Sequence, residues 1–128
     1  MKNIIELETG TRQLLSHIYG NVGIITLNRP ESKNALSDEL TPALRRQISN
    51  FNIDDRVNVL ILTGAGDAFC AGGDVKSMNS SNSKKGGWSK STSEKIVIKN
   101  LQEKQMTLTH NLYNFSKPTI AALPGAAA

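Results

Sequence analysis

Two short runs of hydrophobic and β-prone residues stand near the start of the chain. They are Gln13–Tyr19 and Val22–Asn28, and the pair Gly20-Asn21 separates them. Glycine and asparagine tolerate the positive φ angles of a tight two-residue turn. The pattern therefore predicts a β-hairpin.

A helix is predicted after a polar loop. Residues 29–34 read Arg-Pro-Glu-Ser-Lys-Asn, a turn-rich stretch in which proline fixes φ and keeps the residue before it out of the helical region. Hydrophobic residues then recur at intervals of four, four and three, which places one apolar stripe along a helix. They are Leu40, Leu44, Ile48 and Phe51.

The start of this helix has two interpretations. Ser37 can be the N-cap, followed by two acids that suit the positive end of the helix dipole, Asp38 and Glu39. Pro42 then falls beyond the first turn, where a missing N–H is unfavourable. Thr41 as N-cap, with Pro42 as the first helical residue, avoids that conflict. The sequence leaves both open.

A buried strand is predicted next. Val57–Thr63 is a nearly continuous apolar, β-branched run, closed by Gly64 and Gly66. This pattern is typical of a parallel strand that is covered on both faces. Strand, helix and strand in this order predict a right-handed βαβ crossover.

The second half of the chain changes character. Ser77–Ser93 is rich in serine, asparagine, lysine and glycine, which predicts a mobile loop at about 77–93. A helix from about Glu94 to Phe115 is expected to stop at Lys117-Pro118, and the next buried strand is Thr119–Leu123. The sequence ends soon after that strand, with nothing to cover the strand's edge, so we expect a fragment of a larger fold.

Composition narrows the class of protein. A chain of 128 residues with 38% hydrophobic and 20% charged residues suits one globular domain over 1–128. One cysteine excludes an internal disulfide, the first residues lack the apolar run of a signal peptide, and no stretch approaches the roughly 20 apolar residues of a membrane span. We therefore expect a cytoplasmic protein that does not enter membranes.

Charge and spacing argue against two other classes. The chain has 15 Lys+Arg against 11 Asp+Glu, but the cations are dispersed, so nucleic-acid binding is not expected. No group of His, Cys, Asp and Glu has metal-ligand spacing, so no metal site is expected. We assign no role to His17 or His110, and we interpret Cys70 as a small packing residue.

The segment Ala71-Gly72-Gly73-Asp74 is the strongest candidate for chemistry. Two glycines follow a buried strand, and a possible helix cap, Asp74, follows them. Amides at such a turn have no partner within the chain, so they can donate hydrogen bonds to an oxygen that becomes negative during a reaction. The plainer interpretation is that the glycines turn the chain and the aspartate caps a helix.

Five ordered motifs make the chain resemble the crotonase superfamily, the enoyl-CoA hydratase/isomerase family. In order, they are Val22–Pro30, Asn34-Ala35-Leu36, Val59–Gly64, Ala68–Asp74 and Lys117–Gly125. The resemblance begins near residue 13 and matches only the amino-terminal half of a typical member. It implies an α/β fold, the amino-terminal portion of a crotonase-like core of (ββα) repeats wound into a spiral.

The resemblance also implies a site. The substrate is an acyl-CoA thioester whose carbonyl oxygen is held by two backbone amides, so that an enolate is stabilised. Gly73 matches the first donor, whereas the second donor and the catalytic acids belong after Ala128. The residues that match the substrate-binding segments are Ser32, Lys33, Ala35, Ala71, Gly72, Gly73, Asp74, Val75 and Lys76. Lys33 either meets a phosphate or is a solvated cation.

The implied activity is hydration or isomerisation of an enoyl-CoA, as in fatty acid β-oxidation, with no cofactor beyond the coenzyme A of the substrate. The ending Pro124–Ala128 departs from the Asn-Gly-x-Ala of typical hydratases and looks more like members that move a double bond or act on ring-derived acyl groups. An intact chain would be a homo-oligomer, a trimer or hexamer, and the fragment alone is expected to be inactive. The alternative is a truncated, inactive module that binds acyl-CoA or a sister subunit.

Overall fold

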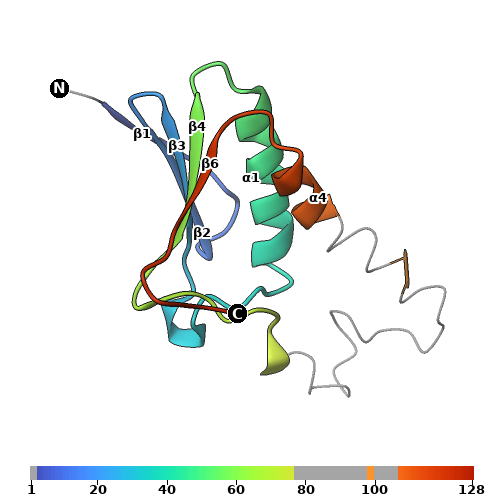
Figure 1. Cartoon of the computed structure of the whole chain (residues 1–128). Coiled ribbons are helices and arrows are strands. Elements are labelled where there is room, and N and C mark those ends of the chain that lie inside the picture. Colours follow the sequence, from blue (N-terminus) through green and yellow to red (C-terminus); the bar gives the residue numbers. More distant parts are fainter. Residues whose placement is uncertain (1–2, 77–97, 100–106) are drawn as a thin grey trace.

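A computed structural model describes residues 3–76, 98–99 and 107–128 (Figure 1). A five-stranded sheet has the order β1-β2-β3-β4-β6, and a separate pair joins β5 to β7. The strands are β1 (Ile4–Leu7), β2 (Leu14–Tyr19), β3 (Val22–Leu27), β4 (Val59–Gly64), β5 (Ala68–Cys70), β6 (Thr119–Ala122) and β7 (Ala126–Ala127). The helices are a 3₁₀ turn (Pro30–Ser32), α1 (Leu40–Ile53) and α4 (Thr107–Tyr113).

The hairpin and the βαβ unit are confirmed. Strands β2 and β3 are antiparallel with Tyr19 opposite Val22, and Gly20 takes the turn with φ of +63°. Strand β4 pairs with β3 in parallel, and α1 lies between them in the chain. Strand β1, which the sequence pattern did not predict, extends the sheet beside β2.

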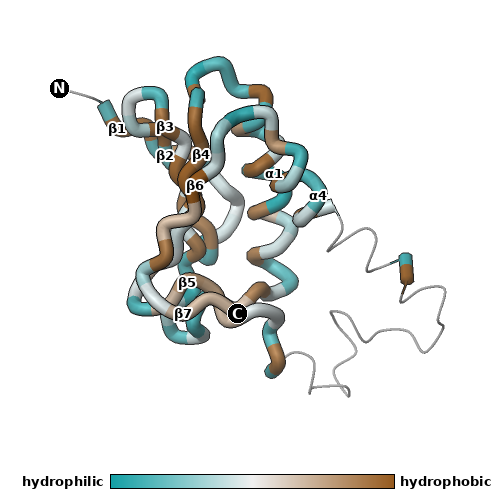
Figure 2. Tube along the Cα trace, viewed as in Figure 1, coloured by the Kyte–Doolittle hydropathy of each residue, from teal (hydrophilic) through white to brown (hydrophobic). Residues whose placement is uncertain are grey.

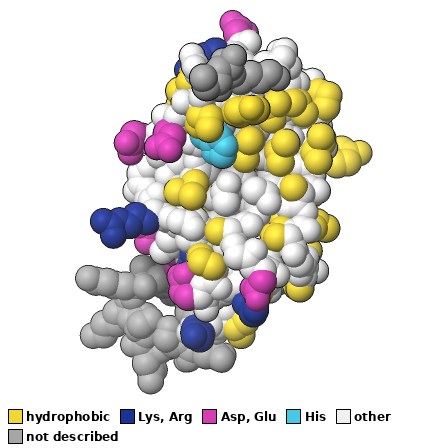
Figure 3. Space-filling view, turned by 90° about the vertical axis from the view of Figure 1, so that its left-hand side faces the viewer, with side chains coloured by type: hydrophobic (Ala, Val, Ile, Leu, Met, Phe, Trp, Pro, Cys, Tyr) yellow, Lys and Arg dark blue, Asp and Glu magenta, His cyan; other side chains and the backbone are white. Residues whose placement is uncertain are grey.

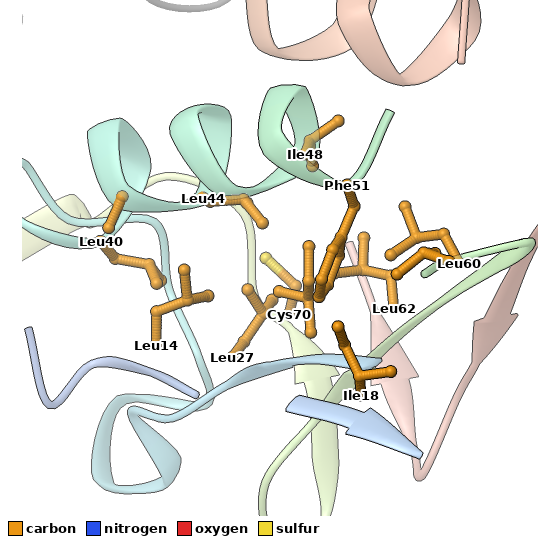
Figure 4. Close-up of a cluster of buried hydrophobic side chains, with 13 residues drawn as sticks. Leu14, Ile18, Leu27, Leu40, Leu44, Ile48, Phe51, Leu60, Leu62 and Cys70 are labelled. Carbon is orange, nitrogen blue, oxygen red and sulfur yellow. The ribbon is translucent and has the colours of Figure 1, made fainter. Parts of the chain in front are cut away.

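The predicted apolar stripe of α1 packs against one face of the sheet. Figure 4 shows side chains of the helix and the strands pointing toward one another. Phe51 and Leu60 are fully buried, and a Cβ on Gly23 would come within 3.0 Å of the Phe51 ring. Glycine in β3 therefore lets the ring lie against the strand backbone. The labelled core is Leu14, Ile18, Leu27, Leu40, Leu44, Ile48, Phe51, Leu60, Leu62 and Cys70.

Ser37 caps the start of α1, which decides between the two interpretations. Its hydroxyl accepts a hydrogen bond from the Leu40 amide at 3.0 Å, and its carbonyl accepts one from the Thr41 amide at 3.0 Å. Pro42 lacks an N–H and cannot continue this ladder, so the regular helix is assigned only from Leu40. Thr41 as the N-cap was wrong.

The sheet is covered on one face only within the described residues, which corrects two expectations. Strand β4 alternates buried and half-buried residues, although it is hydrophobic along much of its length (Figure 2). Strand β6 forms in parallel beside β4, but all its residues are exposed, with Ile120 at 52%. Helices α1 and α4 lie on the same side of the sheet (Figure 1), and hydrophobic side chains gather on the open face (Figure 3).

The connection between α4 and β6 is anchored to the end of α1. Lys117 Nζ donates to the carbonyls of Phe51 and Asp54, both at 2.7 Å. A cation suits the carbonyl end of a helix, and here the Asp54 carbonyl also accepts from the Val57 amide at 3.0 Å. Of the helix predicted from about Glu94 to Phe115, residues 98–99 are helical and α4 ends at Tyr113, two residues early, whereas residues 94–97 and 100–106 and the loop predicted at 77–93 lie outside the described residues.

No helix among the described residues is both long enough and apolar enough to cross a bilayer.

The buried ring of Phe51 gives a stability prediction. Phe51→Ala should lower the free energy of unfolding by about 3–5 kcal/mol, because it removes a large apolar group and leaves a cavity. Ile53→Ala, at a position 80% exposed in the same helix, should change it by less than about 0.5 kcal/mol. Urea unfolding measures both. Equal losses in the two variants would contradict the assigned orientation of α1.

Asp54 gives a prediction about pH. The guanidinium of Arg56 hydrogen-bonds both carboxylate oxygens, at 3.0 and 2.7 Å, and the Arg56 amide adds a third bond at 3.0 Å. These bonds lower the pKa of Asp54 to about 2. Because the folded-state pKa lies below the unfolded value of about 3.9, the stabilisation is complete above about pH 5 and is lost as the pH falls toward 2.

An NMR titration of the Asp54 carboxyl carbon checks this assignment. Its midpoint should lie near pH 2 in the native chain. In Arg56→Ala it should rise toward about 3.9, because both side-chain hydrogen bonds are gone. A midpoint that does not move would show that Arg56 is not the cause.

Candidate functional site

The candidate site lies where two parallel strands end. Strands β3 and β4 are in register to Leu27 and Gly64, so the loop after β3 and the turn region after β4 leave the sheet at the same edge. Open α/β sheets bind ligands outside the carboxyl ends of their strands, because connecting segments converge there. The predicted site residues belong to these two segments.

The loop after β3 is tightly folded. After the 3₁₀ turn, Lys33 and Asn34 both adopt left-handed conformations, with φ of +51° and +57°. The amides of Ser32 and Asn34 both donate to the Arg29 carbonyl, at 2.9 and 2.8 Å. The loop is therefore closed by its own main chain, with Lys33 at its outer end.

The turn after β5 is shaped by its glycines and by Cys70. Gly72 has φ of +90°, a conformation that residues with a Cβ rarely adopt. Its amide donates to the Cys70 sulfur at 3.4 Å, and Cys70 is buried. Cys70 therefore packs in the core and accepts a local hydrogen bond, as its interpretation as a packing residue requires.

Main-chain hydrogen bonds join the loop to the turn. The Ala71 amide donates to the Lys33 carbonyl at 3.0 Å, and the Leu36 amide donates to the Gly72 carbonyl at 2.7 Å. The Asp74 amide donates back to Leu36 at 3.2 Å. The structure thus brings Ser32, Lys33 and Ala35 beside Ala71–Asp74, whereas Val75 and Lys76 follow as exposed residues.

Gly73 occupies a distinctive place in this junction. It forms a parallel bridge with Leu36 in which its neighbours, Gly72 and Asp74, make the two hydrogen bonds. In a parallel bridge one of the two paired residues makes both hydrogen bonds, here Leu36, so the N–H and C=O of the other residue, Gly73, point away from the partner segment. The Gly73 amide is therefore directed away from the loop, where it can meet an acceptor.

Strand β7 runs along the same turn. It pairs with β5 in parallel, and the Ala128 amide donates to the Cys70 carbonyl at 2.9 Å. A Cβ on Gly125 would come within 1.9 Å of the Asp67 carbonyl, so only glycine permits this approach. The β5–β7 pair could not be predicted from the sequence pattern, because strands of three and two residues give no periodicity.

Asn34 connects the site to the core, and the sequence analysis assigned it no role of its own. Its side chain is fully buried, and Nδ2 donates to the carbonyls of Ala65 and Ala68 at 2.9 and 2.8 Å. Its Oδ1 accepts from the Arg29 amide at 2.7 Å. A usable signal was present, because asparagine is one of the few residues that readily adopt the left-handed conformation.

Arg29 is the second residue that sequence reasoning missed. Its Nη1 donates to the Ala35 carbonyl at 2.6 Å, and its Nη2 lies 3.3 Å from Asp74 Oδ2. The two side chains of this ion pair are only 13% and 16% exposed. The guanidinium fork therefore contacts both segments of the junction.

Lys33 stands at the surface. Its Nζ lies 3.4 Å from Asp67 Oδ1, with the two side chains 63% and 84% exposed. Exposed pairs of this kind contribute about 0–1 kcal/mol and exchange easily with solvent, so the pair leaves the amine available. Both interpretations of Lys33, a phosphate ligand and a solvated cation, stay open.

Other features of the described residues do not compete with this site. No group of three or more His, Cys, Asp and Glu among them could hold a metal ion. One hollow of about 370 Å³ lies between α1 and α4, and another of about 570 Å³ lies beside β1 and β2. Gly73 lines neither of these two hollows.

Comparison with known proteins gives a consistent picture. The family model for enoyl-CoA hydratase/isomerase matches residues 22–127. A probable mitochondrial enoyl-CoA hydratase from Dictyostelium discoideum is 36% identical over 109 residues, covering 84% of this chain and 34% of the relative. A mitochondrial 3-hydroxyisobutyryl-CoA hydrolase from Rattus norvegicus is 34% identical over 118 residues, covering 91% and 28%.

A third relative and a solved structure extend the comparison. The 1,2-epoxyphenylacetyl-CoA isomerase of Escherichia coli is 42% identical over 66 residues, covering 52% of this chain and 25% of the relative. The crystal structure of an enoyl-CoA hydratase/isomerase from Mycobacterium paratuberculosis superposes with a TM-score of 0.71 at 25% identity, covering 90% of this chain and 42% of that one. The chain thus spans well under half the length of these proteins.

The buried amide of Asn34 gives a prediction. Asn34→Ala should lower the free energy of unfolding by about 3 kcal/mol, because one buried and one partly buried carbonyl lose their donor and one amide loses its acceptor. Asn28→Ala is the matched control, since the Asn28 side chain makes one hydrogen bond, to the Arg12 carbonyl. Asn28→Ala should lower the free energy of unfolding by about 1 kcal/mol. Similar losses in urea unfolding would contradict the central role given to Asn34.

Proposed function

Because the chain belongs to the enoyl-CoA hydratase/isomerase family and has the amino-terminal portion of the crotonase fold, we propose that it processes an acyl-CoA thioester by stabilising the enolate. The reaction proposed is hydration or isomerisation of an enoyl-CoA. The single observation that supports this most is the Gly73 amide, directed away from the segment that braces it.

The chemistry follows from where charge develops. When a nucleophile adds to an enoyl thioester, or a proton leaves its α carbon, negative charge collects on the thioester oxygen. An amide already aimed at that oxygen stabilises the charge without reorganising during the reaction. Gly73 would supply one such donor. A complete oxyanion hole needs a second amide, which we place after Ala128, because β7 leads the chain toward this turn.

The coenzyme A portion would lie along the loop and the turn. Ser32, Lys33 and Ala35 stand on one side of the junction, and Ala71–Lys76 stand on the other. The formal net charge of +4 favours the approach of a polyanionic ligand. The coenzyme A of the substrate is the only cofactor this proposal requires.

The relatives agree on the class of substrate and differ in the reaction that they are named for. Three relatives are named for hydration, isomerisation and hydrolysis, and all three names specify a CoA thioester. The shared segment therefore suits what these reactions have in common, which is the thioester. A homo-oligomeric state for an intact chain and a cytoplasmic location stay predictions, and two of these relatives are named as mitochondrial.

A second candidate function is a catalytically inactive module that binds acyl-CoA or a sister subunit. The observation in its favour is β6, which pairs with β4 on one side and, among the residues that the structure describes, forms an edge of the sheet. Edge strands present unpaired main-chain groups that can pair with another chain. Sequencing the gene beyond the codon for Ala128 separates the two. Glycines and acids encoded there favour the enzyme, whereas a stop codon favours the module.

Substitutions at Gly73 test the proposal in the full-length gene product. Gly73→Pro should lower kcat for hydration of a 2-enoyl-CoA or isomerisation of a 3-enoyl-CoA by about 10²–10³-fold, because proline has no N–H to donate. Gly73→Ala keeps the amide, and Gly73 is not among the glycines with positive φ. The alanine variant should therefore keep most of the activity.

Two outcomes would contradict the proposal. One is a full-length protein that neither binds coenzyme A nor turns over either substrate. The other is a proline variant that stays folded and matches the activity of the alanine variant. Circular dichroism on both variants separates loss of the donor from loss of the fold.

A further inference from the structure

The Arg29 guanidinium stands between the two segments that hold Gly73. It donates to the Ala35 carbonyl, one residue before the bridge partner Leu36, and it pairs with the Asp74 carboxylate, one residue after Gly73. A guanidinium is planar and presents its donors in a fixed fork, so these two contacts set the spacing between the segments. The flexible ammonium of a lysine would not fix this spacing between the two segments.

Main-chain hydrogen bonds hold the turn to the loop, and its two glycines can add no side-chain contacts to them. Gly72 and Gly73 have no side chains, and glycine has a wide choice of φ and ψ. The direction of the Gly73 N–H depends on the peptide plane between these two residues. The carbonyl in that plane, of Gly72, accepts from the Leu36 amide at 2.7 Å, whereas the bond on the other side of Gly73, from the Asp74 amide to the Leu36 carbonyl, is 3.2 Å long, at the upper end of the usual range. A contact from the Arg29 side chain to Asp74 can therefore influence the direction of the Gly73 N–H.

The backbone of Arg29 is held independently of its side chain. The Arg29 amide donates to Asn34 Oδ1 at 2.7 Å, and Asn34 is fixed to the carbonyls of Ala65 and Ala68. Contacts from the core therefore anchor the base of the brace. The guanidinium transmits that position to Asp74 and the turn.

We infer that Arg29 is a positioning residue: its guanidinium fixes the direction of the Gly73 amide by tying Ala35 to Asp74. This inference rests on the proposed function of Gly73. Arg29 does not act as a charge on the substrate, because the Asp74 carboxylate 3.3 Å away offsets its charge. Geometry and charge can be separated, since lysine keeps the charge and loses the fork.

The test uses the full-length gene product and acetoacetyl-CoA as the probe. On binding, C2 of this thioester gives a proton to water, and the enolate that forms absorbs in the near ultraviolet. The pH midpoint of that absorbance for the bound probe measures how strongly the donors stabilise negative oxygen. A residue that only supports folding changes the amount of bound probe and leaves the midpoint in place.

Arg29→Lys should raise this midpoint by about one pH unit or more, which corresponds to a roughly tenfold weaker stabilisation of the enolate. It should lower kcat for enoyl-CoA turnover by about ten- to a hundredfold with little change in KM, because a small displacement of a donor has effects of that size. Hydrogen exchange of the Leu36 and Asp74 amides should become faster. Asp74→Asn should change the pH midpoint, kcat and the exchange rates in the same direction as Arg29→Lys.

Arg56→Lys is the matched control, since Arg56 pairs with Asp54 at the surface. It should leave the midpoint, kcat and the exchange rates unchanged. If Arg29→Lys does not fold, Asp74→Asn removes the same ion pair and decides the question.

The inference is overturned if both variants keep the wild-type midpoint and exchange rates, or if the loss of activity matches the loss of folded protein. It is also overturned if Arg29→Lys restores the activity that an Arg29→Gln variant lacks, since charge would then be sufficient. Failure of the proposed function looks different, because the wild-type protein itself would then bind no probe or form no enolate.

Discussion

The parallel bridge between Leu36 and Gly73 is the constraint on which the candidate site depends. In this bridge Leu36 uses its own N–H and C=O to bond Gly72 and Asp74, so the amide of Gly73 between them is turned outward. The bridge forms only if the loop and the turn lie side by side with Leu36 opposite Gly73. The hydrogen bonds of Asn34 hold the loop in this position, and Gly72, in a conformation that favours glycine, holds the turn in its position.

The core explains why the two segments meet at all. Parallel pairing of β3 and β4 requires a crossover, and α1 supplies it while burying the apolar residues of both strands. The loop and the turn region then emerge at one edge of the sheet. Lys117 adds a clamp at the opposite end of α1, where it binds two carbonyls. Packing thus places the site, and hydrogen bonds give it its shape.

The sequence predicted the elements that have a clear period or a clear terminator. The hairpin, the stripe of α1 and the parallel strand followed from spacing, and the cap of α1 required the structure, because both Ser37 and Thr41 are good caps. Motifs brought Ser32, Lys33, Ala35 and the Gly72-Gly73 turn into one hypothesis, and the structure places them together. Their binding roles stay predictions.

Other features could not be predicted, for physical reasons. Strands β5 and β7 are too short for periodicity, and the contacts of Arg29 with Asp74 and of Asn34 with Ala65 and Ala68 join residues more than 30 positions apart. The open face of the sheet was misjudged because an apolar strand pattern reports the capacity for burial. It does not report whether a cover is present among the residues that the structure describes.

The two consecutive left-handed residues of the loop, Lys33 and Asn34, have a thermodynamic consequence for any ligand. Each such conformation is unfavourable for a residue with a side chain, and the hydrogen bonds of Asn34 hold the loop there before a ligand arrives. The conformational entropy is therefore lost during folding and not during association. A ligand that meets such a loop keeps more of its interaction energy as affinity, because little of it is needed to order the protein.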